Sequence, residues 1–469
     1  MIQKPEIQTS EAIEAINSWV ALFGADLVFE AENAAQIMVQ HFPENPTCWL
    51  ALSQSLQRLD KTQNALLAMK QAFELNPTNS DICWNLGLLF NELGDANNAQ
   101  LFFQKELALN PKSLRAHYQI ANLLTNRLLF NEALFYWEKM LQIEPSNADI
   151  HANYAMALLR MGELKKGLSE YLWLHHSNCS SKNKPNHPGL SKPQWQGESL
   201  KNKTIIICGE QGLGDMIQFV RYSQHLKNLE AIVWVAVSNP LIDLFKTVPW
   251  IDRVCGSGEQ IRTDDYDFWS FFMTLPYLLK TDLVSIPCNV PYLSADETKS
   301  EWWKIWLEKQ IPKNHKRIGL VWAGSPTHSN DANRSIAFSE LEAFSNLENV
   351  TFVSLQLGEK AQKEVVEGLA GMTILDASVF IADFSDSAAL LKNLDLLITV
   401  DSAPAHLAGA LNLPVWAMIP AVPDWRWFLV STDSPWYSSM RLFRQSEVGD
   451  WASVLEDVKT EIVLKFASR

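Results

Sequence analysis

The sequence predicts a multidomain chain, in which an all-α superhelix of paired helices precedes an α/β domain made of two lobes. Three observations lead to this prediction: a 34-residue period in the first third, a polar stretch rich in Ser, Asn, Lys and Pro, and an alternation of strand-type and helical segments after it. We expect the superhelix over residues 12–175, a linker over 176–203, and the two lobes over 204–310 and 311–469.

The period consists of small, large and proline positions that recur together. The repeated residues are Pro43, Pro77, Pro111 and Pro145; Ala31, Ala65, Ala99, Ala133 and Gly167; and Leu22, Leu56, Phe90, Leu124 and Leu158. A small residue lets two helices approach, a large one fills the space between them, and a proline ends the second helix of each pair. One such hairpin cannot bury its apolar face alone, so about five of them must stack. The pattern resembles the tetratricopeptide repeat (TPR) family.

The sixth position of each repeat, which in TPR proteins tends to face a groove, is mostly a carboxamide. The residues proposed for the groove are Asn17, Asn85, Gln119 and Asn153. Because amides both donate and accept hydrogen bonds, such a ladder could hold the backbone of an extended peptide, so a protein partner is expected there. The repeats of the O-linked N-acetylglucosamine transferases have a ladder of this kind. The alternative is that Asn is simply common at this position of the repeat.

Composition excludes several other classes of protein. The 469 residues include 53 acids and 39 Lys plus Arg, a net charge of -14, which disfavours binding to nucleic acid. No apolar run reaches the roughly 18 residues that a membrane span needs, so we expect no membrane span. We expect a cytoplasmic location, because the cysteine pattern suits a reducing compartment. The six cysteines form no CxxC pair, which argues against both a disulfide framework and a zinc site.

The second half alternates β-type runs with helical segments, the pattern of parallel sheets that bind ligands at the carboxyl ends of their strands. The expected strands are KTIIICG, AIVWVAV, WIDRVC and DYDFWS in the first lobe, and RIGLVWAG, VTFVSLQ, LDLLITVD and LPVWAMIP in the second. Two such units in tandem predict two Rossmann-like lobes that face a cleft. Trp195, near the end of the linker, is expected to dock on the first lobe.

The first chemical motif is GEQGLGDMIQF, residues 209–219, which follows a strand and opens a helix. Its glycines fit neither GxGxxG nor a P-loop, which disfavours a Rossmann oxidoreductase. Asp215 stands at the helix start, where it either faces the cleft or serves as a cap that complements the helix dipole. The residues assigned to the acceptor side of the cleft are Gln211, Gly212, Gly214 and Gln218.

The second motif is the polar loop after the strand that ends near Gly324. This loop carries Arg334, whose guanidinium could bind a diphosphate with two parallel hydrogen bonds, or could simply be an exposed surface residue.

The third motif is VDSAPAHLAGAL, in which a strand runs into Asp401 and a helix begins at Ser402 or Ala403. The positive end of that helix suits a phosphate group. His406 lies one turn into the helix, where it either contacts a donor or packs.

Together the three motifs look like glycosyltransferase family 9, which includes the ADP-heptose:lipopolysaccharide heptosyltransferases, and more closely like bacterial proteins that join TPR repeats to such a domain. The resemblance implies the GT-B fold and an inverting, metal-independent transfer. It makes Asp215 the general base, Arg334 the counterpart of a heptosyltransferase lysine, and Asp401 to His406 the donor-binding turn. Ala403 stands where those enzymes favour glycine, so ADP-heptose is not assumed as the donor.

The sequence therefore predicts a glycosyltransferase that moves a sugar from a nucleotide-sugar co-substrate, without cofactor or metal, to an acceptor hydroxyl on a protein, peptide or glycan. The TPR arm would present the acceptor or a partner protein. The alternative is a non-catalytic TPR scaffold whose α/β domain binds nucleotide sugar. A DxD pair, Asp265 and Asp267, has no third ligand nearby in sequence, which disfavours a metal site.

Overall fold

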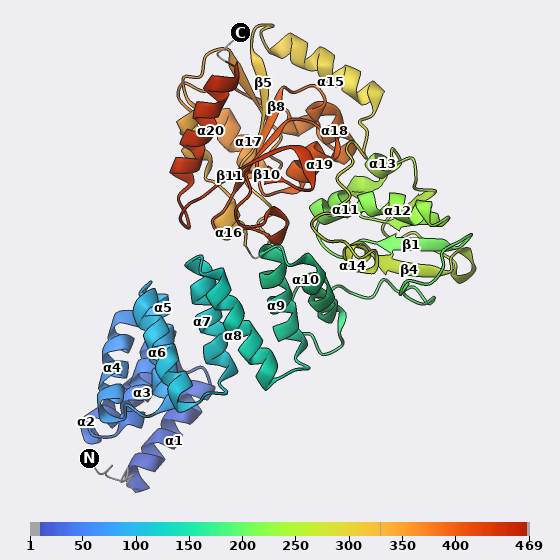
Figure 1. Ribbon diagram of the computed structural model, residues 1–469. Helices are drawn as coiled ribbons and strands as arrows, with labels where there is room; N and C mark the ends of the chain where they lie inside the picture. The colour runs from blue at the N-terminus through green and yellow to red at the C-terminus, as the bar shows by residue number, and fades with distance from the viewer. Residues whose placement is uncertain (1–9, 329, 467–469) are drawn as a thin grey trace. The chain divides into compact units, whose positions relative to one another are not determined.

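The computed structural model describes residues 10–328 and 330–466 (Figure 1). The chain forms two compact units, the first ending at Ile150 and the second beginning at His151. The boundary falls inside helix α9 (Ala148–Arg160). The second unit therefore contains most of α9, α10 (Leu164–Tyr171), the short 3-10 helix η1 (Leu172–His175) and the whole α/β domain.

Eight helices of the first unit form antiparallel pairs, as the period predicts. They are α1 (Ser10–Gly24), α2 (Val28–His41), α3 (Pro46–Arg58), α4 (Thr62–Leu75), α5 (Ser80–Glu92), α6 (Ala96–Leu109), α7 (Leu114–Asn126) and α8 (Phe130–Ile143). From α2 on, each helix begins 34 residues before the helix two places later. Helices α2, α4, α6 and α8 each end two residues before one of the repeated prolines, which confirms the helix-ending role predicted for them.

Two further positions recur every 34 residues that the sequence analysis did not single out. One is a side chain that caps the first helix of a repeat by accepting hydrogen bonds from its first N–H groups, and it is provided by Asn45, Asn79, Ser113 and Asn147. Such caps satisfy backbone donors that a helix end leaves free. The other is the turn between the two helices, where one residue has a left-handed backbone: Asp26, Asp60, Gly94, Leu128 and Gly162.

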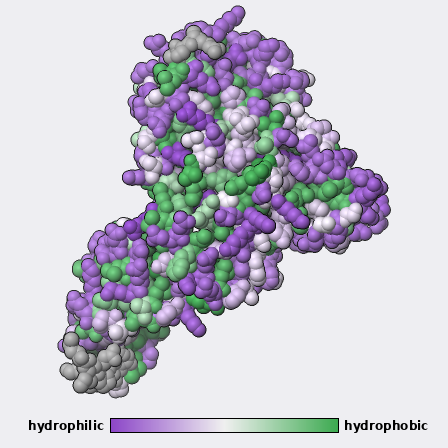
Figure 2. Space-filling view, viewed as in Figure 1, coloured by the Kyte–Doolittle hydropathy of each residue, from purple (hydrophilic) through white to green (hydrophobic). Residues whose placement is uncertain are grey.

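The small positions of the repeats are the closest contacts of this core. Ala31, Ala65 and Ala99 are fully buried, and Ala133 is 2% exposed. Gly87 packs so tightly that a Cβ there would overlap the ring of buried Phe103. Outside the core, hydrophobic residues are interspersed with hydrophilic ones on the face of the repeats seen in Figure 2.

The first lobe is built on a four-stranded parallel sheet. Its strands are β1 (Thr204–Cys208), β2 (Ile232–Ala236), β3 (Arg253–Cys255) and β4 (Phe268–Phe271), in the order β3-β2-β1-β4. Short helices connect them: α11 (Leu213–Phe219), α12 (Ser223–Asn228) and α13 (Ile242–Phe245); a fourth, α14 (Leu275–Leu278), follows β4. Because β2 and β4 lie on opposite sides of β1, the strand order reverses between β1 and β4. Trp195, 2% exposed, docks here and donates its backbone N–H to the Trp269 carbonyl at 2.8 Å, as predicted.

The second lobe has a seven-stranded sheet of order β10-β11-β9-β8-β5-β6-β7. The strands are β5 (Lys316–Val321), β6 (Val350–Ser354), β7 (Ile374–Asp376), β8 (Leu396–Val400), β9 (Val415–Ile419), β10 (Asp433–Ser434) and β11 (Tyr437–Arg444), and only the β10–β11 pair is antiparallel. Helices α15 (Glu297–Gln310), α16 (Asp331–Arg334), α17 (Glu359–Glu367), α18 (Phe384–Leu391), α19 (Ala403–Ala410) and α20 (Trp451–Phe466) flank the sheet (Figure 1). Its strand order reverses between β5 and β8.

Arg221 joins the two lobes. This side chain is 2% exposed, and its Nε donates to the Gln218 carbonyl in the first lobe at 2.7 Å. One terminal nitrogen donates to the carbonyls of Pro287, in the connection between the lobes, and Trp436, in the second lobe, while the other donates to the Tyr292 hydroxyl. In the parts of the chain that the structure describes, no helix is both long and apolar enough to cross a bilayer.

Candidate active site

The structure brings the loops at the two strand-order reversals together. Helix α11 follows β1, and α19 follows β8, so both begin at the carboxyl edge of a sheet, where open α/β sheets bind ligands. A Cβ on Gly214 would lie 2.9 Å from Cδ2 of His406 and 3.4 Å from the Ala403 Cα. The missing side chain at Gly214 therefore lets the starts of α11 and α19 meet, and the residues predicted from separate motifs share one site.

Asp215 caps its own helix, as one of the two predicted alternatives has it, and also contacts the second lobe. Its Oδ2 accepts the backbone N–H of Gly212 at 2.8 Å, which caps α11. Its Oδ1 forms an ion pair with Arg426 of the second lobe. Burial raises the pKa of the Asp215 carboxyl, although the neighbouring guanidinium opposes that rise. A carboxylate at the meeting point of two lobes, with a raised pKa, is suited to accept a proton.

Arg426 was not predicted. It lies in the short 3-10 helix η8 (Trp425–Trp427), is 7% exposed at the side chain, and donates to Asp424 Oδ1 at 2.8 Å. Its guanidinium lies 4.7 Å from the ring centre of Trp425 and 5.5 Å from that of Phe219. The only signal in the sequence is an arginine among tryptophans in PDWRW, a segment to which the sequence analysis assigned no role.

Acidic residues of the second lobe surround this arginine. Burial and the charge of Asp424 raise the pKa of Asp401, which is 9% exposed. For Asp424 the opposing effect of burial is outweighed by Arg426, so that the pKa of its carboxyl is lowered. Arg334 lies close enough to Asp401 to oppose the rise of its pKa. Cations and anions therefore alternate through the site.

Arg334 is held against the end of β5. Its Nε lies 3.3 Å from Asp331 Oδ1, and its side chain is 13% exposed. A Cβ on Gly324 would overlap the Arg334 guanidinium and lie 2.6 Å from that same Asp331 oxygen, so a larger residue there would displace both side chains. Gly324 also donates its N–H to the Ser335 hydroxyl at 2.9 Å.

The turn after β8 leaves the start of α19 without a side-chain cap. The hydroxyl of Ser402 bonds instead to the Thr399 hydroxyl at 2.9 Å, and no side-chain cap forms at Ser402. His406 is 5% exposed, stacks on Trp427 and contacts the Tyr437 hydroxyl through Nδ1 at 3.0 Å. Burial lowers the pKa of His406 to about 3, so the ring is neutral and packs beneath the site.

Residues of the fifth repeat reach this site from within the second unit. Gln211 donates a hydrogen bond to the Tyr171 hydroxyl. Arg160 of α9 donates to the Pro423 carbonyl at 2.8 Å, next to Asp424. Gln218, which the sequence analysis assigned to the acceptor side, is fully buried in α11. Its amide atoms have no hydrogen-bond partner among the described residues.

Glu210 and His175 form a buried contact behind the loop. Glu210 Oε1 accepts the Met273 N–H at 2.6 Å, and its Oε2 lies 3.5 Å from His175 Nε2. Burial raises the pKa of Glu210 to about 8 and lowers that of His175 to about 4. At neutral pH the contact is therefore between an uncharged carboxylic acid and an uncharged imidazole.

The groove residues proposed from the repeats lie in both units. Asn17 is exposed and Asn85 and Gln119 are half-buried in the first unit, whereas Asn153 is exposed in the second. Asn85 donates its amide to the Asp81 carbonyl of its own helix at 2.7 Å, so its oxygen is the group most available to a ligand.

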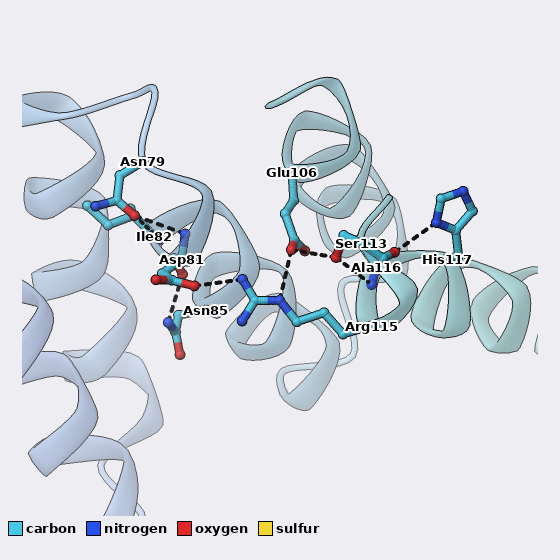
Figure 3. Close-up of polar contacts among 9 residues, drawn as sticks. All are labelled: Asn79, Asp81, Ile82, Asn85, Glu106, Ser113, Arg115, Ala116 and His117. Carbon is cyan, nitrogen blue, oxygen red and sulfur yellow. Dashed lines mark hydrogen bonds and ion pairs between the residues drawn. The ribbon is translucent and has the colours of Figure 1, made fainter. Parts of the chain in front are cut away.

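A polar network lies beside Asn85 (Figure 3). Arg115 of α7 donates to Glu106 of α6 at 2.8 Å and to Asp81 of α5 at 2.6 Å, so it links three successive helices. Glu106 is fully buried and also accepts the Ser113 hydroxyl at 2.7 Å. Since Asp81 and Arg115 occupy the same position of adjacent repeats, this pair also fixes the spacing between them.

Within residues 10–328 and 330–466 no cluster of three or more His, Cys, Asp or Glu is arranged to hold a metal ion. Asp267 of the DxD pair instead fastens two strands, because its carboxylate accepts the Thr204 N–H and the Lys203 ammonium, each at 2.9 Å.

Comparison with known proteins agrees with both parts of this architecture. Residues 46–79 and 80–113 match the tetratricopeptide repeat model. Residues 349–424 match glycosyltransferase family 9 (heptosyltransferase). Both resemblances stated from the sequence are thereby confirmed. The family 9 segment covers β6 to Asp424 and includes the donor turn, while Asp215, Arg334 and Arg426 lie outside it.

Among curated proteins, Protein FlbA of Caulobacter vibrioides is 26% identical over 332 residues, covering 66% of this chain and 54% of FlbA. The chain thus spans about half the length of this relative. Among solved structures, the TPR protein YrrB, described as having an unusual peptide-binding site, is 19% identical with a TM-score of 0.31, covering 34% of this chain and 84% of its own. MamA from Desulfovibrio magneticus RS-1 is 15% identical with a TM-score of 0.32, covering 35% and 92%.

Proposed function

We propose that the protein is an inverting, metal-independent glycosyltransferase that uses a nucleotide-sugar donor, with the TPR repeats presenting the acceptor or a partner protein. The observation that carries this proposal is the meeting of α11 and α19 at Gly214, which brings an acidic side chain from one lobe to a phosphate-binding type of helix start in the other. The family 9 match supports the same reaction class.

The site residues would divide the reaction between the lobes. The acceptor hydroxyl attacks the anomeric carbon and passes its proton to the Asp215 carboxylate, while the bond to the leaving nucleoside diphosphate breaks with its electron pair. Negative charge that develops on the diphosphate would be stabilised by the positive end of α19, where Ala403 provides a backbone N–H, and by the guanidinium of Arg334. Neutral His406 would pack beneath the donor turn and support it.

The second candidate is a TPR scaffold whose α/β domain binds nucleotide sugar without turnover. The capping bond from Gly212 and the ion pair to Arg426 favour this candidate, because together they give Asp215 a structural role that needs no reaction. Binding of a donor is common to both candidates, whereas turnover distinguishes them.

The test is calorimetric titration of the full chain with UDP-, GDP-, ADP-, CMP- and dTDP-linked sugars, followed by a search for nucleotide release. We expect one donor to bind, and Arg334→Ala to weaken that binding by about tenfold or more through loss of charged hydrogen bonds. Arg253→Ala is the matched control, since Arg253 pairs with Glu259 in the first lobe and is not assigned to the site. If none of the donors binds, both candidates are wrong; if one binds but no acceptor gives turnover, the scaffold is favoured.

A further inference from the structure

Arg426 has a set of contacts that a purely structural arginine does not need. Its two terminal nitrogens contact two carboxylates from opposite lobes, Asp215 and Asp424. The contact to Asp424 is doubled, because the Asp424 carboxylate also accepts the Arg426 backbone N–H at 3.0 Å. The contact to Asp215 is the only one of the two that crosses between the lobes. Asp424 therefore holds the guanidinium from within its own lobe, and Asp215 contacts it from the other lobe.

The guanidinium also has N–H donors that make no hydrogen bond, or only a weak one, within the described part of the chain. Its Nε is buried and has no hydrogen-bond partner among the described residues, and one terminal nitrogen has only the weak acceptor Met273 Sδ, at 3.5 Å, besides Asp215. A buried donor that lacks a partner is costly, so an additional anionic acceptor at this point would be stabilising. Arg426 is also close enough to Asp401, the first residue of the donor turn, to affect its charge.

Asp215, in turn, has both carboxylate oxygens engaged, one by Gly212 and one by Arg426. A carboxylate paired with a guanidinium is a weaker base than a free one, because the cation stabilises its charged form. The ion pair therefore makes Asp215 a weaker base than burial alone would make it.

We propose that Arg426 is a donor-binding residue that exchanges partners, leaving Asp215 for the diphosphate of the nucleotide sugar and so freeing Asp215 to act as the base. This inference rests on the proposed function. A diphosphate carries more negative charge than one carboxylate and offers several oxygens in the geometry that a guanidinium binds best. Asp424 remains bound throughout and keeps the arginine in place. Donor binding thus precedes base activation, so Asp215 is released from Arg426 only when a donor is in the site.

The proposed exchange predicts that the loss of one site residue increases the affinity for a diphosphate. If Asp215 and the diphosphate compete for Arg426, removing the charge of Asp215 must tighten diphosphate binding. We expect Asp215→Asn to bind the preferred nucleoside diphosphate about three- to tenfold more tightly than the unaltered chain. Arg426→Gln should weaken binding by about tenfold or more, and Arg426→Lys by less.

The experiment is calorimetric titration of the full chain with UDP, GDP, ADP, CDP and dTDP, which requires no acceptor and no turnover. The double variant Asp215→Asn/Arg426→Gln completes a cycle, in which the gain from Asp215→Asn must disappear when Arg426 is absent. Glu259→Gln is the matched control, because Glu259 pairs with Arg253 in the first lobe and is not assigned to the site, so its removal should leave the affinity unchanged in both backgrounds.

The outcomes separate the inference from the function on which it rests. If a diphosphate binds and Asp215→Asn binds it no more tightly, the exchange is wrong while the donor site stands. The same holds if the gain survives in the double variant, since it would then reflect general repulsion. If no nucleoside diphosphate binds to any form of the chain, the proposed function itself is wrong. Should Arg426→Gln not fold, Arg426→Lys takes its place in the cycle, and the gain from Asp215→Asn should then be reduced in the double variant.

Discussion

Gln211, in the turn before α11, donates a hydrogen bond to the phenolic oxygen of Tyr171, on the last helix of the repeats. Tyr171 is 1% exposed, so this bond is part of a packed contact. With Arg160 on the Pro423 carbonyl and His175 against Glu210, the fifth repeat contacts the loops that carry the candidate site in both lobes. By structure this repeat belongs to the second unit, although by sequence it belongs to the array.

The first prediction concerns where the chain can be divided. A chain of residues 145–469 retains α9, α10 and η1 and should melt cooperatively, whereas one of residues 176–469 should melt several degrees lower or fail to fold. The reason is that the shorter chain loses the contacts of Arg160, Tyr171 and His175. Differential scanning calorimetry measures both. Tyr171→Phe in the full chain is the control for one hydrogen bond, with an expected cost of about 1 kcal/mol. Equal melting of the two truncated chains would contradict the assignment of the fifth repeat.

The second prediction concerns Asp215 as the base. Once a donor and acceptor are known, Asp215→Asn should lower kcat by about a hundredfold or more without weakening donor binding, because only proton transfer is lost. Steady-state kinetics measure the first and calorimetry the second. Asn keeps the shape and can still accept the Gly212 N–H, so the α11 cap should survive. A parallel loss of donor binding and thermal stability would instead identify Asp215 as a purely structural cap.

The third prediction concerns the pH dependence of stability near Glu210. Its pKa of about 8 in the folded protein exceeds the ordinary value of 4.5, so the folded chain keeps a proton that the unfolded chain releases between these values. The stability gained from the uncharged acid is complete below pH 4.5 and is lost as the pH rises to 8. Relative to Glu210→Gln, the unaltered chain should lose at most about 1.4 kcal/mol of unfolding free energy per pH unit across this window.

Urea unfolding of the second unit at several pH values measures this difference. Glu259→Gln is the control: a hydrogen bond from Arg253 lowers the pKa of Glu259, so any stability it contributes is present above pH 4.5 and is lost only as the pH falls. A difference between Glu210→Gln and the unaltered chain that stays constant from pH 5 to 8 would show that Glu210 is ionised in the folded state.

The fourth prediction concerns the left-handed turns of the repeats. Leu128 has φ +61° at a position where other repeats have Asp or Gly. A left-handed backbone costs a residue with a Cβ about 1–2 kcal/mol, and glycine avoids that cost at about 0.5–1 kcal/mol of extra chain entropy. Leu128→Gly should therefore stabilise the first unit by up to about 1 kcal/mol. Thermal unfolding followed by circular dichroism measures the change.

Gly94 supplies the reverse experiment at the same position of a neighbouring repeat. A Cβ on Gly94 would meet no atom within 4 Å, and its φ is +78°, so Gly94→Ala tests backbone conformation without a steric clash. We expect a loss of about 1 kcal/mol. If both substitutions destabilise the unit, side-chain packing at Leu128 outweighs its backbone strain.

Much of the fold could be predicted because its signals are local. The helix ends follow the prolines, and all eight expected strands are present as β1 to β6, β8 and β9. Strands β7, β10 and β11 were not predicted. β7 and β10 are only three and two residues long, and β11 places Ser and Arg among its apolar residues. Short or mixed strands form because of the strands they pair with, and those neighbours cannot be recognised from the sequence alone.

The site was predictable only where a motif is continuous. Asp215 and the donor turn stand in recognisable loops, but which of two roles Asp215 has could not be decided, because its ion-pair partner Arg426 lies 211 residues later. The contact between Glu210 and His175 could not be predicted either, because the two residues lie in different segments of the sequence. Burial changes the charge of such residues, and burial is a property of the packed chain.

Arg221 determines how the two lobes can move. Breaking its four hydrogen bonds inside the protein would leave a charged group unsatisfied, at a cost of several kcal/mol. A relative movement of the lobes that keeps these four bonds must therefore rotate about this point, because sliding past it would break them. Such a joint works as a pivot, so a small rotation produces the largest displacement at the residues farthest from Arg221 and leaves those beside it almost still.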